Sequence, residues 1–202
     1  MHPERSRTFL PGWGVTAEVW HPFARPGDRL GGEIEPGTHV VGWSLGAMRA
    51  LDFATRNELG SLTLVATTDQ FVRSHLHLQG WPARVLVRMR KRLFEESAQA
   101  VLEEFVSQLF APGEPIVAPP LEDDLTELEK GLVFLEHYSV LGNSAAIRCP
   151  VRLLHGGADS ICPLESAQAL AHVLPQAELT VWPEAGHAPL LTQPDRIRAW
   201  LG

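Results

Sequence analysis

The stretch that decides the fold is His39-Val40-Val41-Gly42-Trp43-Ser44-Leu45-Gly46, where a short apolar run meets the pattern Gly-x-Ser-x-Gly. The residues that follow, 47–56, favour a helix. A serine between a strand and a helix is typical of a nucleophile elbow, a sharp turn that exposes the hydroxyl. Glycine is expected at Gly42 and Gly46 because a side chain there would collide with the neighbouring helix or strand. The turn also puts Ser44 at a helix N-terminus, where free N–H groups favour negative charge.

Two later segments supply the acid and the base that a catalytic serine needs. Residues 151–159 form an apolar run that ends in a glycine loop carrying Asp159, and residues 179–187 form another that ends at His187. The order serine, acid, histidine is the one that this elbow architecture requires. We therefore predict that His187 accepts the Ser44 proton, while Asp159 fixes the tautomer of His187.

The composition is that of an ordinary globular protein. The chain has 202 residues, of which 45% are hydrophobic and 20% are charged, which is enough for one core and too little for two domains. Its net charge of -7 argues against a nucleic-acid partner. The sequence shows neither a signal-peptide pattern nor an apolar run of membrane-spanning length. We therefore expect a cytoplasmic protein without a membrane partner.

The cysteines and most histidines form no recognisable site. Cys149 and Cys162 lie in different sequence contexts and give neither a disulfide framework nor a metal spacing. His75, His77 and His137 show no metal-ligand pattern either, and we expect them at the surface. Because serine catalysis needs no metal and no cofactor, neither is predicted.

Strand-like and helix-like stretches alternate along most of the chain. Strand-forming runs occur at residues 7–10, 39–43, 62–66, 151–155 and 179–182. Several of them are apolar throughout, which is typical of parallel strands that are buried on both faces. Helix-forming stretches occur at residues 47–56, 164–174 and 194–201. This alternation predicts an α/β fold with a mostly parallel sheet of about five strands and helices on both faces.

Residues 70–143 interrupt the alternation, since they contain no convincing strand. They favour amphipathic helices at residues 82–96, 98–110 and 121–138, with a proline-rich connection over 111–120. We predict that residues 70–143 are an inserted helical lid and that residues 1–69 and 144–202 form one core.

With these motifs in place, the chain resembles the α/β-hydrolase family over nearly its whole length. Three segments are similar to the pimeloyl-acyl-carrier-protein methyl ester esterases of biotin synthesis. They are Leu10-Pro11-Gly12-Trp13-Gly14-Val15-Thr16-Ala17-Glu18-Val19-Trp20, Gly42-Trp43-Ser44-Leu45-Gly46 and Glu184-Ala185-Gly186-His187-Ala188-Pro189-Leu190. The resemblance implies hydrolysis of a methyl ester on a pimeloyl chain that is attached to acyl carrier protein.

The chain departs from the family pattern at its N-terminal end. Pro11-Gly12 stands where the family usually has His-Gly, although the backbone N–H of Trp13 can still serve with that of Leu45 as an oxyanion donor. The family also carries more strands before Trp13 and between Trp13 and Ser44. The resemblance therefore implies an α/β-hydrolase fold with a trimmed sheet, in which residues 27–33 remain as a loop.

Several of these residues have a simpler explanation. Ser44 alone fits a tight structural turn. Asp69 also follows an expected strand and is an alternative acid to Asp159, although a helix cap or turn role explains it too. Trp13 and Trp43 are either core aromatics or side chains that flank Ser44 and line an apolar acyl slot. His155 lies near the acid loop, but we expect it to be packed and hydrogen-bonded.

A basic run lies in the first helix of the expected lid. Arg84, Arg88 and Arg92 recur at four-residue spacing beside Lys91, opposite Val85, Leu86, Met89 and Leu93. A solvated face, with Lys91 and Arg92 paired to acids one turn later, is the simpler explanation. In an acidic chain, however, this cluster also suits docking of an acidic partner such as acyl carrier protein.

Three hypotheses follow for the function. The first is a monomeric serine carboxylesterase that acts on a carrier-linked methyl ester. The second is a general short-chain carboxylesterase or thioesterase, and the third is a hydrolase-fold binding protein with an inert triad.

Overall fold

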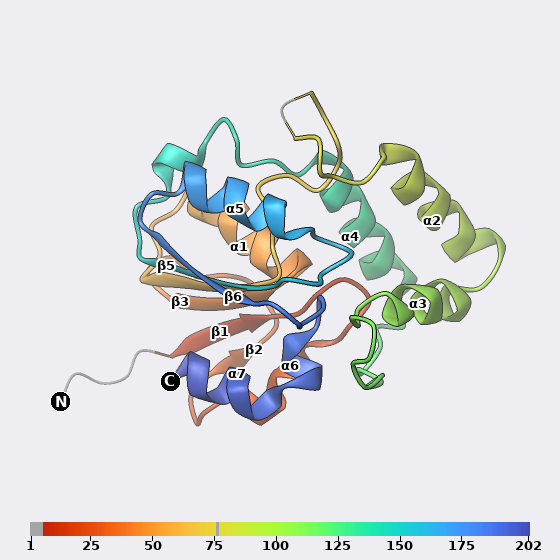
Figure 1. The fold of residues 1–202 in the computed structure, drawn as a ribbon, viewed down its shortest axis with the longest axis horizontal. Helices are drawn as coiled ribbons and strands as arrows, with labels where there is room; N and C mark the ends of the chain where they lie inside the picture. Colours follow the sequence, from red (N-terminus) through yellow and green to blue (C-terminus); the bar gives the residue numbers. More distant parts are fainter. Residues whose placement is uncertain (1–5, 76) are drawn as a thin grey trace.

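The computed structural model describes residues 6–75 and 77–202, and a parallel sheet forms its centre (Figure 1). In this part of the chain the sheet has six strands in the order β2-β1-β3-β4-β5-β6, and every neighbouring pair is parallel. The strands are β1 (Arg7–Leu10), β2 (Arg29–Leu30), β3 (His39–Trp43), β4 (Ser61–Val65), β5 (Val151–Gly156) and β6 (Ala177–Trp182). The predicted parallel α/β sheet is confirmed.

The edge of the sheet differs from the sequence prediction. Residues 27–33 were expected as a loop, but Arg29–Leu30 form β2 and pair in parallel with Thr8 and Phe9 of β1. A strand of two residues is too short to show a period in the sequence. It exists because β1 offers an unpaired edge to its backbone.

Helices cover both faces of the sheet. In Figure 1, α1 (Leu45–Ala54) and α5 (Leu164–Val173) lie above the sheet, and α7 (Pro194–Leu201) lies below it. The 3-10 helix η1 (Ala17–Phe23) belongs to the lower face too, since Arg198 of α7 stacks over Phe23. The remaining short helices of the core are η2 (Ser144–Ala146) and α6 (Pro189–Thr192).

Three further helices lie between β4 and β5 in sequence, and Figure 1 shows them beside the sheet, at the ends of its strands. They are α2 (Ala83–Glu95), α3 (Ala98–Ser107) and α4 (Leu125–His137), and α2 packs against the other two. The helix α4 begins later than predicted because the Asp124 side chain caps it by accepting a hydrogen bond from the Thr126 N–H. Within the described residues, none of the helices is both long and apolar enough to cross a membrane.

Candidate active site

Ser44 sits on the sharp turn between β3 and α1. Its φ of 52° and ψ of -117° are a strained backbone conformation for a residue with a side chain. A Cβ at Gly42 would lie 2.6 Å from the Ala47 Cα, and a Cβ at Gly46 would lie 2.5 Å from the Leu10 carbonyl oxygen. Both glycines are therefore required by close backbone approach, as the nucleophile-elbow pattern predicts.

Three loops at the carboxyl ends of β3, β5 and β6 bring Ser44, Asp159 and His187 together. The Nε2 of His187 lies 2.8 Å from the Ser44 Oγ, and its Nδ1 lies 2.7 Å from the Asp159 Oδ2. All three residues are buried, and His187 has no exposed surface. Because a carboxylate accepts from Nδ1–H, Nε2 is left as the acceptor for the Ser44 hydroxyl proton.

The Asp159 carboxylate is held in its charged form. Its Oδ1 accepts hydrogen bonds from the backbone N–H groups of Ile161, at 2.8 Å, and Cys162, at 2.9 Å. Burial raises the pKa of Asp159, but the attraction and hydrogen bond of His187 and the Cys162 N–H outweigh it and lower the pKa below its usual value. His155, as expected, is packed nearby, with its Nε2 2.6 Å from the Cys162 carbonyl oxygen, and burial lowers the pKa of His155.

The alternative acid lies in a separate buried pair. Asp69 follows β4, but its Oδ1 is 2.9 Å from the Nδ1 of His77, whereas His187 contacts Asp159. The expectation that His77 lies at the surface is wrong, since only 2% of it is exposed. A single histidine in a loop has no neighbours whose periodicity could indicate burial. His77 is buried because its ring contacts Asp69. Among the described residues, no cluster of His, Cys, Asp and Glu has the arrangement of a metal site.

The two predicted oxyanion donors are backbone N–H groups in the turns that follow β1 and β3. Leu45 is the first residue of α1, and Trp13 lies in the turn after β1. Within the described residues, neither backbone N–H has a hydrogen-bond acceptor. Both N–H groups therefore remain able to donate to a ligand.

The two predicted tryptophans occupy different places. The Trp13 ring is buried edge-on against Phe105, its Nε1 donates to the Leu128 carbonyl, and it lines a slot with Ser44. Trp43 does not line that slot. Its Nε1 donates to the His187 carbonyl oxygen at 2.8 Å, so this hydrogen bond fixes the loop that carries His187.

The slot beside the Ser44 hydroxyl is apolar and very small. Its other walls come from the β4–α2 loop, α2, α3, α4 and the acid loop, through Phe71, Trp81, Leu86, Met89, Phe105, Leu132, Leu135 and Ile161. Its volume of about 20 Å³ has room for little more than one water molecule. An acyl chain therefore requires these side chains to move apart. Apart from Trp13, none of these wall residues is predicted from the sequence to line the slot.

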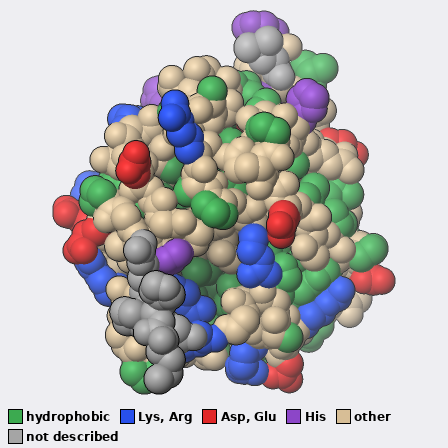
Figure 2. Space-filling model, turned by 90° about the vertical axis from the view of Figure 1, so that its left-hand side faces the viewer, with side chains coloured by type: hydrophobic (Ala, Val, Ile, Leu, Met, Phe, Trp, Pro, Cys, Tyr) green, Lys and Arg blue, Asp and Glu red, His purple; other side chains and the backbone are tan. Residues whose placement is uncertain are grey.

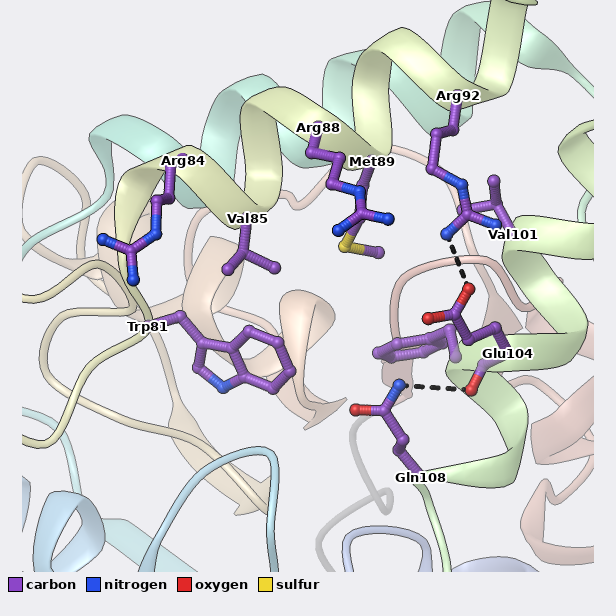
Figure 3. A pocket seen from close by; sticks show the side chains of 10 residues that line it. Trp81, Arg84, Val85, Arg88, Met89, Arg92, Val101, Glu104 and Gln108 are labelled. Carbon is purple, nitrogen blue, oxygen red and sulfur yellow. Dashed lines mark hydrogen bonds and ion pairs between the residues drawn. The ribbon is translucent and has the colours of Figure 1, made fainter. Parts of the chain in front are cut away.

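A larger groove of about 410 Å³ adjoins the slot between α2 and α3. The slot and the groove share Trp81, Met89 and Phe105, so these side chains separate the two spaces. Figure 3 shows the predicted basic residues Arg84, Arg88 and Arg92 extending from α2 into the groove. The groove therefore has a cationic side and leads towards Ser44.

The predicted separation of the basic stripe from the apolar residues of α2 is only partly correct. Leu86 and Leu93 are buried as expected, but Val85 and Met89 line the groove together with the arginines. The ion pairs also divide the basic residues into two groups.

Two of these basic residues are neutralised by acids. Lys91 pairs with Glu95, while Arg92 pairs with Glu96 one turn later and with Glu104 of α3. Hydrogen bonds to these two glutamates raise the pKa of Arg92. Within the described part of the chain, Arg84 and Arg88 have no acidic partner, so they are the cations that remain available to a ligand.

The sequence is similar to those of known enzymes over most of its length. The sequence pattern of the alpha/beta hydrolase family matches residues 10–200. The pimeloyl-[acyl-carrier protein] methyl ester esterase of Aromatoleum aromaticum is 32% identical, over 92% of this chain and 78% of that protein. The enzyme of the same name from Chromobacterium violaceum is 31% identical, over 85% of this chain and 72% of that protein.

Solved structures show the same fold. An esterase from Exiguobacterium antarcticum superposes with a TM-score of 0.78, at 14% identity, over 97% of this chain and 90% of that one. The enol-lactonase from Burkholderia xenovorans superposes with a TM-score of 0.79, at 15% identity, over 99% of this chain and 91% of that one. With the strand, turn and helix around Ser44 and the match over residues 10–200, the chain belongs to the alpha/beta hydrolase family.

Proposed function

We propose that the protein is a serine carboxylesterase that hydrolyses the methyl ester of a pimeloyl chain carried on acyl carrier protein. The observation that carries this proposal is the Ser44 hydroxyl, which is hydrogen-bonded to His187 and faces an apolar slot. The curated relatives that are similar over most of the chain bear the name of this esterase.

The triad residues have distinct roles in the proposed reaction. The Ser44 Oγ attacks the ester carbonyl carbon while His187 takes its proton, and Asp159 stabilises the imidazolium that forms. His187 then gives the proton to the methoxy oxygen, and methanol leaves an acyl group on Ser44. A water molecule, activated by His187, attacks the acyl group and releases the free carboxylate.

The backbone N–H groups of Trp13 and Leu45 form the proposed oxyanion hole. Each attack turns the carbonyl oxygen into an oxyanion, and these donors have no acceptor within the described residues. The Trp13 ring contacts the acyl chain in the slot, while Trp43 acts on the substrate only through the loop of His187.

Residues 70–143 act as the lid of this site, and residues 1–69 and 144–202 form the hydrolase core. The slot supports this division, because residues 70–143 supply most of its walls while the core supplies Ser44. Moving Trp81, Met89 and Phe105 would join the slot to the groove and admit an elongated substrate. The monomeric state, the cytoplasmic location and the absence of nucleic-acid and membrane partners remain predictions.

The carrier protein docks on the basic residues of α2. Of the four predicted residues, Arg84 and Arg88 carry the proposal, because Lys91 and Arg92 already pair with acids. On the face away from α2 and α3, acidic and basic side chains are interspersed (Figure 2). An acidic carrier is therefore attracted to the groove more than to that face, and the phosphate of its prosthetic arm also finds guanidinium partners in the groove.

Changing both Arg84 and Arg88 to Glu should lower kcat/KM for the carrier-linked ester about 10- to 100-fold, because charges at the rim steer the encounter. Turnover of a small soluble ester should stay near wild type. Raising the salt from about 0.05 to about 0.5 M should reduce the wild-type rate in the same direction, since it shortens the screening length.

The matched control changes Arg56 and Arg148 to Glu, which alters the net charge equally at a separate hollow. Steady-state kinetics on both substrates across the salt series measure the effect. Equal losses in the two double variants would contradict local docking, and a loss on both substrates would indicate a disrupted lid.

The substrate itself is tested by comparing the carrier-bound methyl ester with free dimethyl pimelate. We expect kcat/KM to be higher for the carrier-bound ester, and we expect the gene to restore growth of a biotin auxotroph that lacks its methyl ester esterase. Equal turnover of both esters without complementation would favour a general short-chain carboxylesterase or thioesterase. Failure of a fluorophosphonate to label Ser44 would favour the non-catalytic binding protein.

A further inference from the structure

We infer that Glu114, which lies in the proline-rich connection between α3 and α4, positions the catalytic histidine. The inference rests on the proposed function, because it gives Glu114 a part in the reaction of Ser44 and His187. The sequence predicts residues 111–120 only as a connection between lid helices. In the structure this connection contacts the loop that carries His187.

The Glu114 carboxylate accepts hydrogen bonds from three donors and so joins the connection to the segment around His187. Its Oε2 accepts from the Ala111 N–H at 2.7 Å and from the Gly186 N–H at 3.0 Å. Its Oε1 accepts from the Thr192 hydroxyl at 2.9 Å. Gly186 immediately precedes His187, and Thr192 ends α6. One side chain therefore contacts both ends of residues 186–192, the histidine segment.

The backbone of the histidine segment finds its acceptors in the lid. The N–H groups of His187, at 2.8 Å, and Ala188, at 3.2 Å, both donate to the carbonyl oxygen of Leu109. Together with the Gly186 N–H, three successive donors therefore point at residues 109–114. On the core side, Trp43 donates to the His187 carbonyl oxygen. The position of the imidazole thus depends on the lid as well as on Asp159.

The contact leaves no room for a side chain at Gly186. A Cβ on Gly186 would lie 2.5 Å from the Ala111 nitrogen and 2.7 Å from the Glu114 Oε2. The two segments therefore pack backbone to backbone, and the carboxylate fills the remaining gap with hydrogen bonds. Loss of this carboxylate would leave two backbone N–H groups without their acceptor and free the loop to shift.

A shift of the imidazole affects the chemical step more than binding. The Nε2 of His187 must stay within hydrogen-bond reach of the Ser44 Oγ, and an error of about 1 Å costs about 100-fold in rate. Glu114 itself lines neither the slot nor the groove. Its removal should therefore lower kcat and leave KM nearly unchanged.

The test compares Glu114→Ala, Glu114→Asp and Glu114→Gln in the full chain. We expect the Ala and Asp variants to lose kcat about 10- to 100-fold on a small p-nitrophenyl ester, because neither side chain reaches all three donors. The Gln variant should stay within about threefold of wild type, because its amide oxygen can accept from both N–H groups and its NH2 can donate to Thr192.

The rate of Ser44 labelling by a fluorophosphonate gives a second readout. In the Ala variant the labelling rate constant should fall with kcat, while the final stoichiometry stays complete and shows that the protein is folded. Glu103→Ala is the matched control, since Glu103 is an exposed lid glutamate whose carboxylate contacts only Gln99 within the described residues. It should retain the wild-type kcat and labelling rate.

Wild-type kcat and labelling rate in Glu114→Ala would overturn the inference. So would a loss of kcat that Glu114→Gln fails to restore and that follows a lowered melting temperature, because that pattern describes a purely structural residue. If the wild-type protein is labelled but hydrolyses neither carrier-bound nor free esters, the proposed function fails, and the labelling rates of the variants still decide the role of Glu114.

Discussion

Replacing Ser44 by Ala is expected to lower kcat about 10⁴- to 10⁶-fold on both carrier-linked and small esters. The change removes the covalent route, while the proposed oxyanion donors of Trp13 and Leu45 and the slot are retained. Alanine keeps the Cβ that the elbow already accommodates and leaves His187 hydrogen-bonded to Asp159. The fold should therefore persist, with an unchanged circular dichroism spectrum.

Fluorophosphonate labelling provides the control for this variant. The wild-type protein should incorporate one label at Ser44, and the Ala variant should incorporate none. Near-normal hydrolysis by the Ala variant after removal of contaminating host esterases would exclude Ser44 as the nucleophile.

The second large effect is expected for Asp159→Asn, which should lower kcat about 10³- to 10⁴-fold at neutral pH. The amide is isosteric, and its oxygen can still accept from the Ile161 and Cys162 N–H groups. Its NH2 group, however, donates to the Nδ1 of His187 and leaves the proton on Nε2. In that tautomer the imidazole cannot accept the Ser44 proton.

Asp69→Asn is the matched control for the triad acid. Asp69 pairs with His77 instead of His187, so this variant should keep most of the activity per folded molecule. Its thermal stability should fall, because the buried His77 Nδ1 loses a charged partner. A large loss of kcat in Asp69→Asn together with an active Asp159→Asn would assign the acid to Asp69.

The sequence predicts the structure correctly where a local pattern is compatible with only one backbone structure. The run from His39 to Gly46 predicts a strand, a turn and a helix, and the structure contains all three. Apolar runs predict the other long strands of the parallel sheet. The edge strand β2 was not predicted, because a strand of two residues shows no hydrophobic periodicity. The burial of His77 was not predicted either, because its contact with Asp69 forms only when the loop folds.

The sequence by itself determined the family, the parallel sheet and the three residues that the structure brings together at the site, because strand-loop motifs in a fixed order meet at one edge of such a sheet. Tertiary structure alone decided which surfaces surround that site. The walls of the small slot, the pairing of Arg92 with Glu104 and the hydrogen bond between Glu114 and the loop of His187 all join residues from different elements. Such contacts depend on how helices and loops pack, and packing leaves no periodic signal in the chain.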